Sequence, residues 1–274
     1  MPMRFALNHM CVPNRSFEDL FGLAKELGLD HVEIRNDLAG QAIADGTSAR
    51  DIRDAAARAG IKLATINALQ RFNEWNNQRE SEAKYLVDYA AACGAEGLVL
   101  VPTNDGSGCA DGERQGNLRK ALEGLKPILD EAKVTGLIEP LGFSSCALRQ
   151  KSEAVDAIIK LGAADTFSLV HDTFHHHVAA EADIFPQHTG LVHLSGVSNA
   201  DVAEEDMLDA HRELIGERDR LDNVSQISAL EQGGYKGVFS FEPFSQHVHA
   251  LDDPASALRT SIEFLESRIV RAAA

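Results

Sequence analysis

Short apolar runs alternate with longer amphipathic segments along the whole chain. We expect the apolar runs to form strands, and they are Phe5–Asn8, His31–Ile34, Leu63–Asn67, Leu98–Val101, Leu137–Glu139, Leu169–Asp172, Leu191–Leu194 and Val238–Glu242. The segments expected to be helices are Ser16–Leu27, Ser48–Ala59, Arg79–Cys93, Glu113–Lys133, Ser152–Leu161 and Pro254–Val270. In the second of these, apolar side chains recur at the i, i+3, i+4, i+7 spacing of one helix face: Ile52, Ala55, Ala56 and Ala59.

Capping residues support these boundaries. A serine hydroxyl can accept a hydrogen bond from the first free N–H groups of a helix, and serines begin three of the segments: Ser16, Ser48 and Ser152. Glycines stand where a left-handed residue would end a helix before the next strand: Gly28, Gly60, Gly94 and Gly162. The sequence therefore predicts a regular alternation of strand and helix.

The spacing of the expected strands indicates the fold. Successive strands begin about 33 residues apart on average, the size of a strand–helix–strand unit. Recurrence at this period favours a closed parallel (β/α)8 TIM barrel of the α/β class over an open, doubly wound sheet. No Pro- or Ser-rich linker interrupts the sequence, so we expect one domain over residues 1–274.

One connection is much longer than the others. Nearly 48 residues separate the starts of the seventh and eighth strands, and the extra length includes the charged segment Asn199–Asp222. A long connection at the C-terminal face of a barrel is usually a lid or a wall of the active site. We therefore expect this insertion to border the site.

Composition narrows the class of protein. The chain has 274 residues, of which 44% are hydrophobic and 25% are charged, as in soluble globular proteins. Lys and Arg number 26 and Asp and Glu number 42, and the resulting charge of −16 opposes binding to a nucleic-acid backbone. No apolar run approaches the roughly 18 residues of a membrane span, and the first residues do not resemble a signal peptide. We expect a cytoplasmic protein with no nucleic-acid or membrane partner.

Four consecutive expected strands end in residues that bind metal ions: Glu139, Asp172, His193 and Glu242. Side chains at the carboxyl ends of barrel strands converge on one mouth. Burying a lone carboxylate there would cost several kcal/mol unless something compensates its charge. A divalent cation provides that compensation. A set rich in oxygen with one imidazole suits Mn²⁺, Mg²⁺ or Co²⁺, with Zn²⁺ as an alternative, and we take Mn²⁺ as the first choice.

These residues and their neighbours resemble a known family. Glu139-Pro140, Asp172-x-x-His175, His193 and Glu242 are similar to the pattern of the xylose isomerase-like (AP endonuclease family 2) TIM barrels, and the resemblance covers nearly the whole chain. In that family a Glu, Asp, His and Glu from strands five to eight hold one divalent metal ion. The histidine three residues after the strand-six Asp contacts substrate, which implies the same role for His175.

Three further segments resemble the 2-keto-myo-inositol isomerases of this family: residues 5–9, 67–73 and 171–177. This resemblance implies conversion of 2-keto-myo-inositol to 1-keto-D-chiro-inositol in inositol catabolism. Ketose 3-epimerases carry an arginine several residues after the strand-seven His, whereas this chain reads Ser195–Asn199 there. DNA-repair members need additional His ligands from earlier strands, and those histidines are missing here. Both departures favour the isomerase.

Other polar residues at the expected mouth are candidates for binding a substrate. His9 follows the first strand, Glu33 lies in the second, and Asn67 ends the third. The loop after the third strand contributes Arg71 and Trp75. Arg220, in the long insertion, is placed to close over the substrate. Each also has a structural interpretation: a barrel-floor or loop residue for His9, pairing with Arg35 for Glu33, a surface loop for the third-strand residues, and a salt link at a helix start for Arg220.

The expected chemistry is isomerisation of a polyhydroxy ketone through an enediolate. A carboxylate is too weak a base for a carbon acid unless the developing oxyanion is stabilised, and a divalent cation supplies this stabilisation. Glu139 or Glu242 would then move the proton, and His175 would assist at the substrate oxygens. An inosose dehydratase, a ketose epimerase or hydroxypyruvate isomerase, and a polyol-binding barrel without activity remain alternatives. The small-molecule ketone is the expected partner, and a homo-oligomer is left open.

Overall fold

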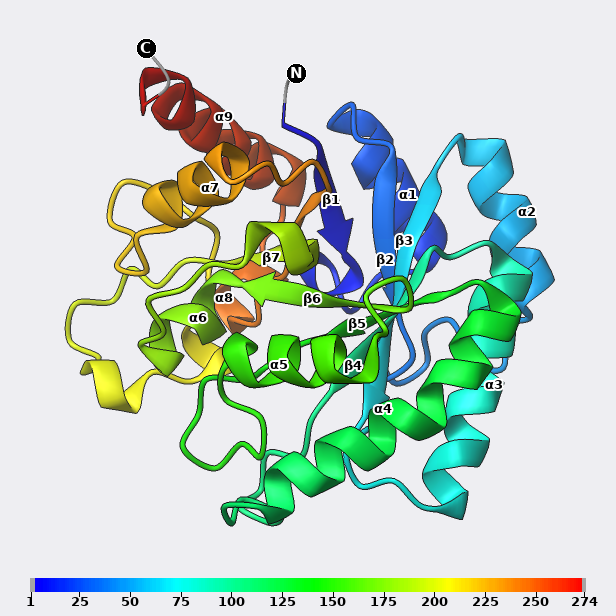
Figure 1. Cartoon of the computed structure of the whole chain (residues 1–274). Coiled ribbons are helices and arrows are strands. Elements are labelled where there is room, and N and C mark those ends of the chain that lie inside the picture. Colours follow the sequence, from blue (N-terminus) through cyan, green and yellow to red (C-terminus); the bar gives the residue numbers. More distant parts are fainter. Residues whose placement is uncertain (1–2, 273–274) are drawn as a thin grey trace.

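Eight parallel strands close into a barrel in the computed structural model, which describes residues 3–272 (Figure 1). The strands are β1 (Phe5–Asn8), β2 (His31–Arg35), β3 (Lys62–Gln70), β4 (Gly97–Val101), β5 (Thr135–Ile138), β6 (Phe167–Asp172), β7 (Thr189–Leu194) and β8 (Phe239–Phe241). Each strand pairs with the next in sequence, and β8 returns to pair with β1. The predicted TIM barrel is confirmed.

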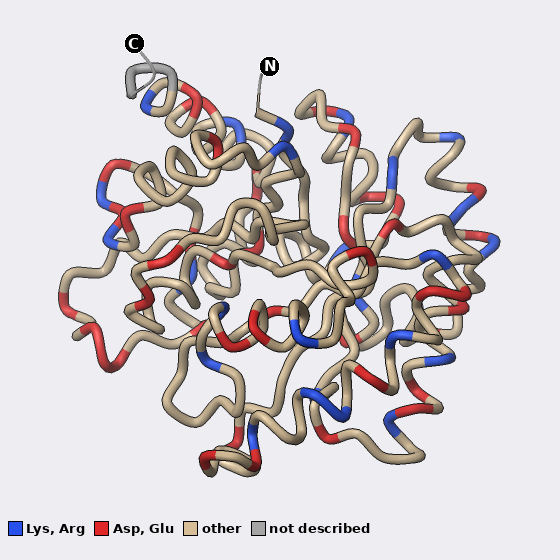
Figure 2. The backbone as a smooth tube through the Cα atoms, viewed as in Figure 1, with Lys and Arg blue, Asp and Glu red and all other residues tan. Residues whose placement is uncertain are grey.

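Helices surround the barrel on its outer side (Figure 1). The α-helices are α1 (Phe17–Glu26), α2 (Ala49–Ala59), α3 (Asn77–Cys93), α4 (Glu113–Ala132), α5 (Lys151–Leu161), α6 (Thr173–Ala179), α7 (Asn223–Gln232), α8 (Gln246–His249) and α9 (Pro254–Ala272). Acidic and basic positions are interspersed along these helices (Figure 2). No helix within residues 3–272 is both long and apolar enough to cross a membrane.

Most of the expected caps are present. The hydroxyls of Ser16 and Ser48 accept hydrogen bonds from the backbone N–H groups of Asp19 and Asp51. The glycines that end α2, α3 and α5 adopt left-handed conformations.

The expected cap at Ser152 is wrong. Helix α5 starts at Lys151, and the Glu181 carboxylate accepts hydrogen bonds from the backbone N–H groups of Lys151 and Ser152, each at 2.9 Å. A carboxylate from a distant loop therefore replaces the local serine cap.

Two apolar layers hold the barrel together. The inner cluster fills the barrel with mostly small or branched side chains, namely Ala6, Ala64, Ala68, Val99, Leu137, Val170, Leu191 and Val238. A much larger cluster lies between the strands and the helices. Because apolar side chains fill the interior, the polar residues that follow the strands are confined to one end of the barrel.

The long insertion between β7 and α7 has little regular structure. It contains the short 3-10 helices η3 (Glu204–Asp206) and η4 (Asp209–His211). Gly196 and Glu213 form an antiparallel bridge across it. Arg220 fastens the intervening loop by donating hydrogen bonds to the carbonyls of Asn199 and Val202 and to the Glu204 carboxylate. The insertion is thus an ordered cover held by backbone and charged contacts.

Candidate metal centre

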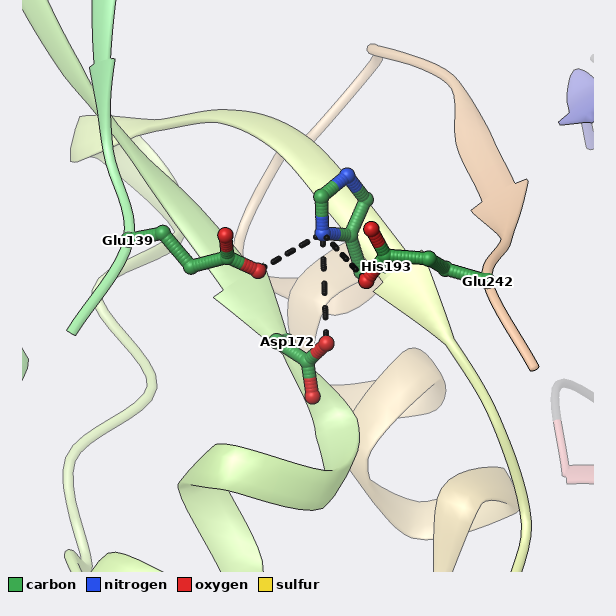
Figure 3. A group of neighbouring side chains, drawn as sticks. All are labelled: Glu139, Asp172, His193 and Glu242. Carbon is green, nitrogen blue, oxygen red and sulfur yellow. Dashed lines mark hydrogen bonds and ion pairs between the residues drawn. The ribbon is translucent and has the colours of Figure 1, made fainter. Parts of the chain in front are cut away.

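The four predicted ligands meet at the carboxyl ends of β5 to β8 (Figure 3). Glu139 and Glu242 each directly follow a strand, Asp172 is the last residue of β6, and His193 lies within β7. One ligand atom from each lies within 4.8 Å of the other three. Neighbouring parallel strands end at the same level, so residues far apart in sequence come together without any local contact.

Their separations suit a common cation. Nδ1 of His193 lies 2.7 Å from Oε1 of Glu139, 3.2 Å from Oε2 of Glu242 and 3.9 Å from Oδ2 of Asp172. Ligand atoms on opposite sides of one ion are about 4.2 to 4.8 Å apart when each bond is about 2.1 to 2.4 Å. The four residues are buried. The set therefore fits one divalent ion.

The charge around His193 points to the same conclusion. Burial alone would lower the pKa of His193, but the carboxylates of Glu242, Glu33 and Glu139 raise it well above its usual value. Such a field favours positive charge at Nδ1, which a metal ion can supply. Nε2 of His193 lies 3.2 Å from Oε2 of Glu33, so an N–H there leaves Nδ1 directed at the other carboxylates.

Asp172 uses its two oxygens differently. Oδ1 accepts hydrogen bonds from the backbone N–H groups of Phe174 and His175, at 2.8 and 2.9 Å, and caps α6. Oδ2 faces His193 and accepts a hydrogen bond from Arg212. Burial would raise the pKa of Asp172, but Arg212 and the neighbouring histidines lower it to about 2. The carboxylate is thus ionised and fixed in direction by the helix that it caps.

Glu242 is surrounded by donors. Its Oε1 accepts hydrogen bonds from Arg35 at 2.7 Å and Asn67 at 3.3 Å, and its Oε2 accepts one from Arg212 at 3.0 Å. Burial raises the pKa of Glu242 to about 7 against the attraction of His193, and Glu139 adds to the rise. A cation between the two glutamates would oppose this rise.

Arg212 is the principal residue that the sequence analysis missed. Its guanidinium is 1% exposed, and it donates to Asp172 and Glu242 through Nη2 and to Ser195 Oγ through Nε at 2.9 Å. It lies 4.6 Å from the ring centroid of Phe244. Arg212 belongs to the long insertion. It lies well beyond Ser195–Asn199, the stretch after His193 in which ketose 3-epimerases carry an arginine. Residues 195–199 contain no arginine, so the departure from the ketose 3-epimerases in this stretch stands, but the insertion brings Arg212 to the ligands from further along the chain.

A cavity of about 460 Å³ opens above these residues. It is lined by Arg35, Asp37, Asn67, Gln70, Arg71, Val101, Pro102, Asn104, Asp105, Glu139, Leu141, His175, Asp209, Arg212, Glu242 and Phe244. The insertion contributes Asp209 and Arg212, as expected for a segment bordering the site. Oε2 of Glu139 accepts no hydrogen bond from residues 3–272, so one carboxylate oxygen is free at the cavity floor.

His175 lines this cavity from α6 and is 4% exposed. Its Nδ1 is buried and has no hydrogen-bond partner within the described residues, and Nε2 lies 3.9 Å from Oδ1 of Asp209. Gly142 allows the loop after β5 to approach, because a Cβ there would lie 2.3 Å from the carbonyl oxygen of His175. The imidazole is therefore held firmly with hydrogen-bonding capacity to spare.

Two of the predicted substrate-binding residues also reach the cavity. Asn67, at 1% exposure, orients Glu242, as described above. Arg71 has a left-handed backbone, with φ at 55°, and its side chain pairs with Glu74 and Asp105. Both residues line the cavity, and their contact with a substrate stays a prediction.

Four other predicted substrate contacts lie outside the residues that line this cavity. His9 is 0% exposed and its Nε2 contacts the Arg15 carbonyl at 2.9 Å. Glu33 is also 0% exposed, and its carboxylate contacts Nε2 of His193 instead of pairing with Arg35. Trp75 packs against Gly124 of α4, and Arg220 fastens the insertion. The pairing of Glu33 with Arg35 is thus absent among the described residues, and substrate binding by these four residues stays a prediction.

His176, on α6, contacts the buried side chain of Lys151. Its Nδ1 lies 2.9 Å from Nζ of Lys151, and the same ammonium lies 2.9 Å from Nδ1 of His171. His171 Nε2 contacts the side-chain oxygen of Gln226 at 2.9 Å. These buried contacts join α5, β6, α6 and α7 behind the metal centre.

Comparisons with known proteins agree with this geometry. Residues 21–268 match the family model described as xylose isomerase-like TIM barrel. The crystal structure of a xylose isomerase domain-containing protein from Salmonella typhimurium LT2 shares 32% identity, covers 98% of this chain and 99% of its own, and superposes with a TM-score of 0.88. No curated protein matches the chain significantly.

Two more distant structures share the fold. The IolI protein with a bound zinc atom is 20% identical, with a TM-score of 0.86 and coverage of 98% of this chain and 99% of its own. An L-ribulose 3-epimerase is 17% identical, with a TM-score of 0.77 and coverage of 99% and 96%. The family match, the similarity to the Salmonella protein and the buried ligand set together show that this chain belongs to the xylose isomerase-like TIM barrel family.

Proposed function

We propose that this protein is a divalent-metal-dependent isomerase of a polyhydroxy ketone, converting 2-keto-myo-inositol to 1-keto-D-chiro-inositol through an enediolate in inositol catabolism. The observation that carries the proposal is the buried set of Glu139, Asp172, His193 and Glu242, which borders a cavity through its two glutamates. The family and the sequence resemblance support the ketone chemistry.

The donor set supports a divalent ion and a first choice among such ions. Three carboxylates and one imidazole form an oxygen-rich site, which suits Mn²⁺ as the first choice and Mg²⁺ or Co²⁺ as alternatives. Zn²⁺ also binds such residues, and the related IolI structure contains zinc. When bound, the cation would stabilise negative charge that develops on the substrate oxygens.

Glu139 is the better placed of the two candidate bases. Its Oε2 is free of hydrogen bonds from the described residues, whereas both oxygens of Glu242 accept them from arginines. A free carboxylate oxygen at the cavity floor can take the proton from the carbon beside the carbonyl and return it to the neighbouring carbon. Glu242 then holds its own orientation through Arg35 and Arg212 and can act on the opposite face of the substrate.

His175 and Arg212 serve the substrate oxygens in this proposal. The buried Nδ1 of His175 needs a partner, and an imidazole can pass a proton between neighbouring oxygens. Arg212 places a permanent positive charge beside Asp172 and Glu242 at the cavity wall. Both groups favour the enediolate over the neutral ketone because negative charge develops on oxygen.

The test is solvent exchange. The purified chain is loaded with Mn²⁺ and incubated in deuterated water with a panel of inososes and ketoses. Deuterium uptake is measured by mass spectrometry, and product stereochemistry is determined by NMR after the metal is chelated. We expect uptake without loss of water. A product lighter by one water would identify a dehydratase, and binding without uptake would identify a barrel that only binds polyols.

Variants separate the roles of the two glutamates. Glu139→Gln should abolish deuterium exchange at the carbon beside the carbonyl. Glu242→Gln should abolish formation of the isomerised product. Unchanged turnover in Glu139→Gln would contradict the assignment of the base. Because both residues are also candidate ligands, metal content is measured for each variant and activity is compared at saturating Mn²⁺.

A ketose 3-epimerase is the second candidate. Arg212 supports it, because an arginine contacts Asp172 and Glu242 although residues 195–199 contain none. Family structures described as L-ribulose and D-psicose 3-epimerases share the fold. In the same assay, inversion at one carbon of an open-chain ketose without movement of the carbonyl would select this reaction.

A further inference from the structure

A second cavity lies beside the first and is lined by residues 36–44, the end of β3 and α3. Its volume is about 380 Å³, and Asp37 and Gln70 line both it and the first cavity. The two cavities therefore share part of their walls at these two residues. Sites for small ligands usually measure about 300 to 1,000 Å³. The second cavity is large enough to take one further small unit of a ligand that occupies the first.

The walls of this second cavity offer an aromatic ring and an apolar floor. Tyr85 of α3 lines it and is 57% exposed. Ile43 also lines it and has a left-handed backbone, with a φ of 73°. This conformation is unfavourable for a β-branched residue, so the loop holds Ile43 there at a conformational cost. An exposed tyrosine facing apolar side chains suits the C–H face of a sugar ring.

The charges in this cavity are already matched. Arg79 pairs with Glu82, and Asp37 pairs through both oxygens with Arg35 at 2.7 and 2.8 Å. Glu82 balances the charge of Arg79, although the buried Nε of Arg79 has no hydrogen-bond partner within residues 3–272, and Arg35 is paired with Asp37. Neither arginine therefore offers an unbalanced charge to a phosphate or a carboxylate. The side-chain amide of Gln70 makes no hydrogen bond to residues 3–272, so it can serve hydroxyl groups at the junction. The chemistry selects a neutral, hydroxylated ligand.

We infer that the second cavity is a glycosyl subsite, and that the substrate class includes a cyclic polyol ketone carrying an O-linked sugar. The ketone ring would occupy the first cavity above the metal ligands, and the sugar would pass Asp37 and Gln70 to lie against Tyr85. This inference rests on the proposed function for the identity of the ketone unit. It adds that the enzyme prefers the glycosylated form to the free ring.

Binding of unreactive probes tests this without turnover. The full chain with Mn²⁺ is titrated by calorimetry with myo-inositol and with galactosyl-myo-inositol. We expect the glycoside to bind at least about tenfold more tightly, equivalent to about 1.4 kcal/mol. Tyr85→Ala removes the aromatic ring, and Ala44→Trp fills the second cavity with a large side chain. Both variants should lose this advantage and keep the affinity for myo-inositol unchanged. Ile159→Ala, at a 59% exposed residue of α5, is the matched control.

The outcomes separate this inference from the proposed function. Equal affinities, no binding of the glycoside, or an advantage that survives Tyr85→Ala would each overturn the subsite. Simultaneous binding of both probes would overturn it as well, because the glycoside must displace the free ring. If no inosose or ketose exchanges deuterium while the glycoside advantage holds and depends on Tyr85, then the subsite stands and the proposed reaction fails.

Discussion

Nε2 of His193 and the Oε2 of Glu33 lie 3.2 Å apart, and both side chains are fully buried. Thr65 Oγ1 donates to the same Glu33 oxygen at 2.6 Å. Burial would raise the pKa of Glu33, but His193 lowers it to about 2, so the carboxylate is ionised. Glu33 thereby fixes which nitrogen of His193 faces Glu139, Asp172 and Glu242.

Replacing this carboxylate should weaken metal binding without removing a ligand. We expect Glu33→Gln to lower the affinity for Mn²⁺ by about 10- to 100-fold, the usual effect of losing the partner of a ligating histidine. Isothermal titration of the metal-free protein measures this change. Glu96→Gln, at an exposed position, is the control. Equal affinities for Glu33→Gln and the unmodified protein would show that Glu33 does not orient His193.

Arg212 should contribute to stability as well as to the reaction. Its buried guanidinium contacts Asp172 and Glu242, and removing one partner of a buried ion pair costs about 3 to 5 kcal/mol. Arg212→Ala should lower the free energy of unfolding in urea by that amount. Arg268→Ala should cost less than about 1 kcal/mol, because the Arg268–Glu217 pair is exposed. Similar losses for both variants would contradict the importance of the buried pair.

The strand ends were predictable because the barrel repeats. Apolar runs at a regular spacing located β5 to β8, and parallel strands place their carboxyl ends together. Glu139, Asp172, His193 and Glu242 could therefore be grouped although β5 and β8 are distant in sequence. Helix starts were less secure, as α5 shows: its cap comes from Glu181 in another connection, and no local pattern reveals that.

The paths of the loops were not predictable in this way. Irregular backbone carries no periodicity, so Arg212 could not be placed at the ligands from its distance along the chain. Trp75 and Arg220 were judged by their position after a strand or near a helix, yet one packs on Gly124 and the other binds backbone carbonyls. Glu33 lies in a strand and was located correctly, but only the coordinates show its contact with His193.

Lys151 should make stability depend on pH in the alkaline range. Burial lowers its pKa from a usual value of about 10.5 to about 8, and the opposing charges of Glu181 and Asp183 only partly offset this. Between pH 8 and 10.5 the unfolded chain therefore holds a proton that the folded chain has lost, so stability rises with pH. Over the whole window this contribution amounts to about 3 kcal/mol.

The difference between the unmodified protein and Lys151→Met isolates this contribution. The groups facing Lys151 are His171, His176, Glu181 and Asp183, and all of them remain in the variant. We expect the free energy of unfolding to climb less steeply between pH 8 and 10.5 in Lys151→Met. Parallel curves would mean that Lys151 titrates normally in the folded protein.

Arg220 should control the opening of the insertion. Its guanidinium binds the carbonyls of Asn199 and Val202 and the Glu204 carboxylate, and Glu204 also contacts Nε2 of His177 on α6. Without Arg220 these carbonyls must find water, so local opening becomes easier.

Limited digestion can measure that opening, because Leu208 in the insertion is 56% exposed. Chymotrypsin should cut after Leu208 about tenfold faster in Arg220→Ala than in the unmodified protein, since cleavage follows the population of the open form. Arg218→Ala alters an exposed neighbour two residues away and should leave the rate unchanged. Mn²⁺ affinity should be the same in both variants, because Arg220 lies outside the residues that line the cavity. If Arg220→Ala is cleaved no faster than the unmodified protein and binds Mn²⁺ more weakly, then Arg220 acts at the metal site and does not fasten the insertion.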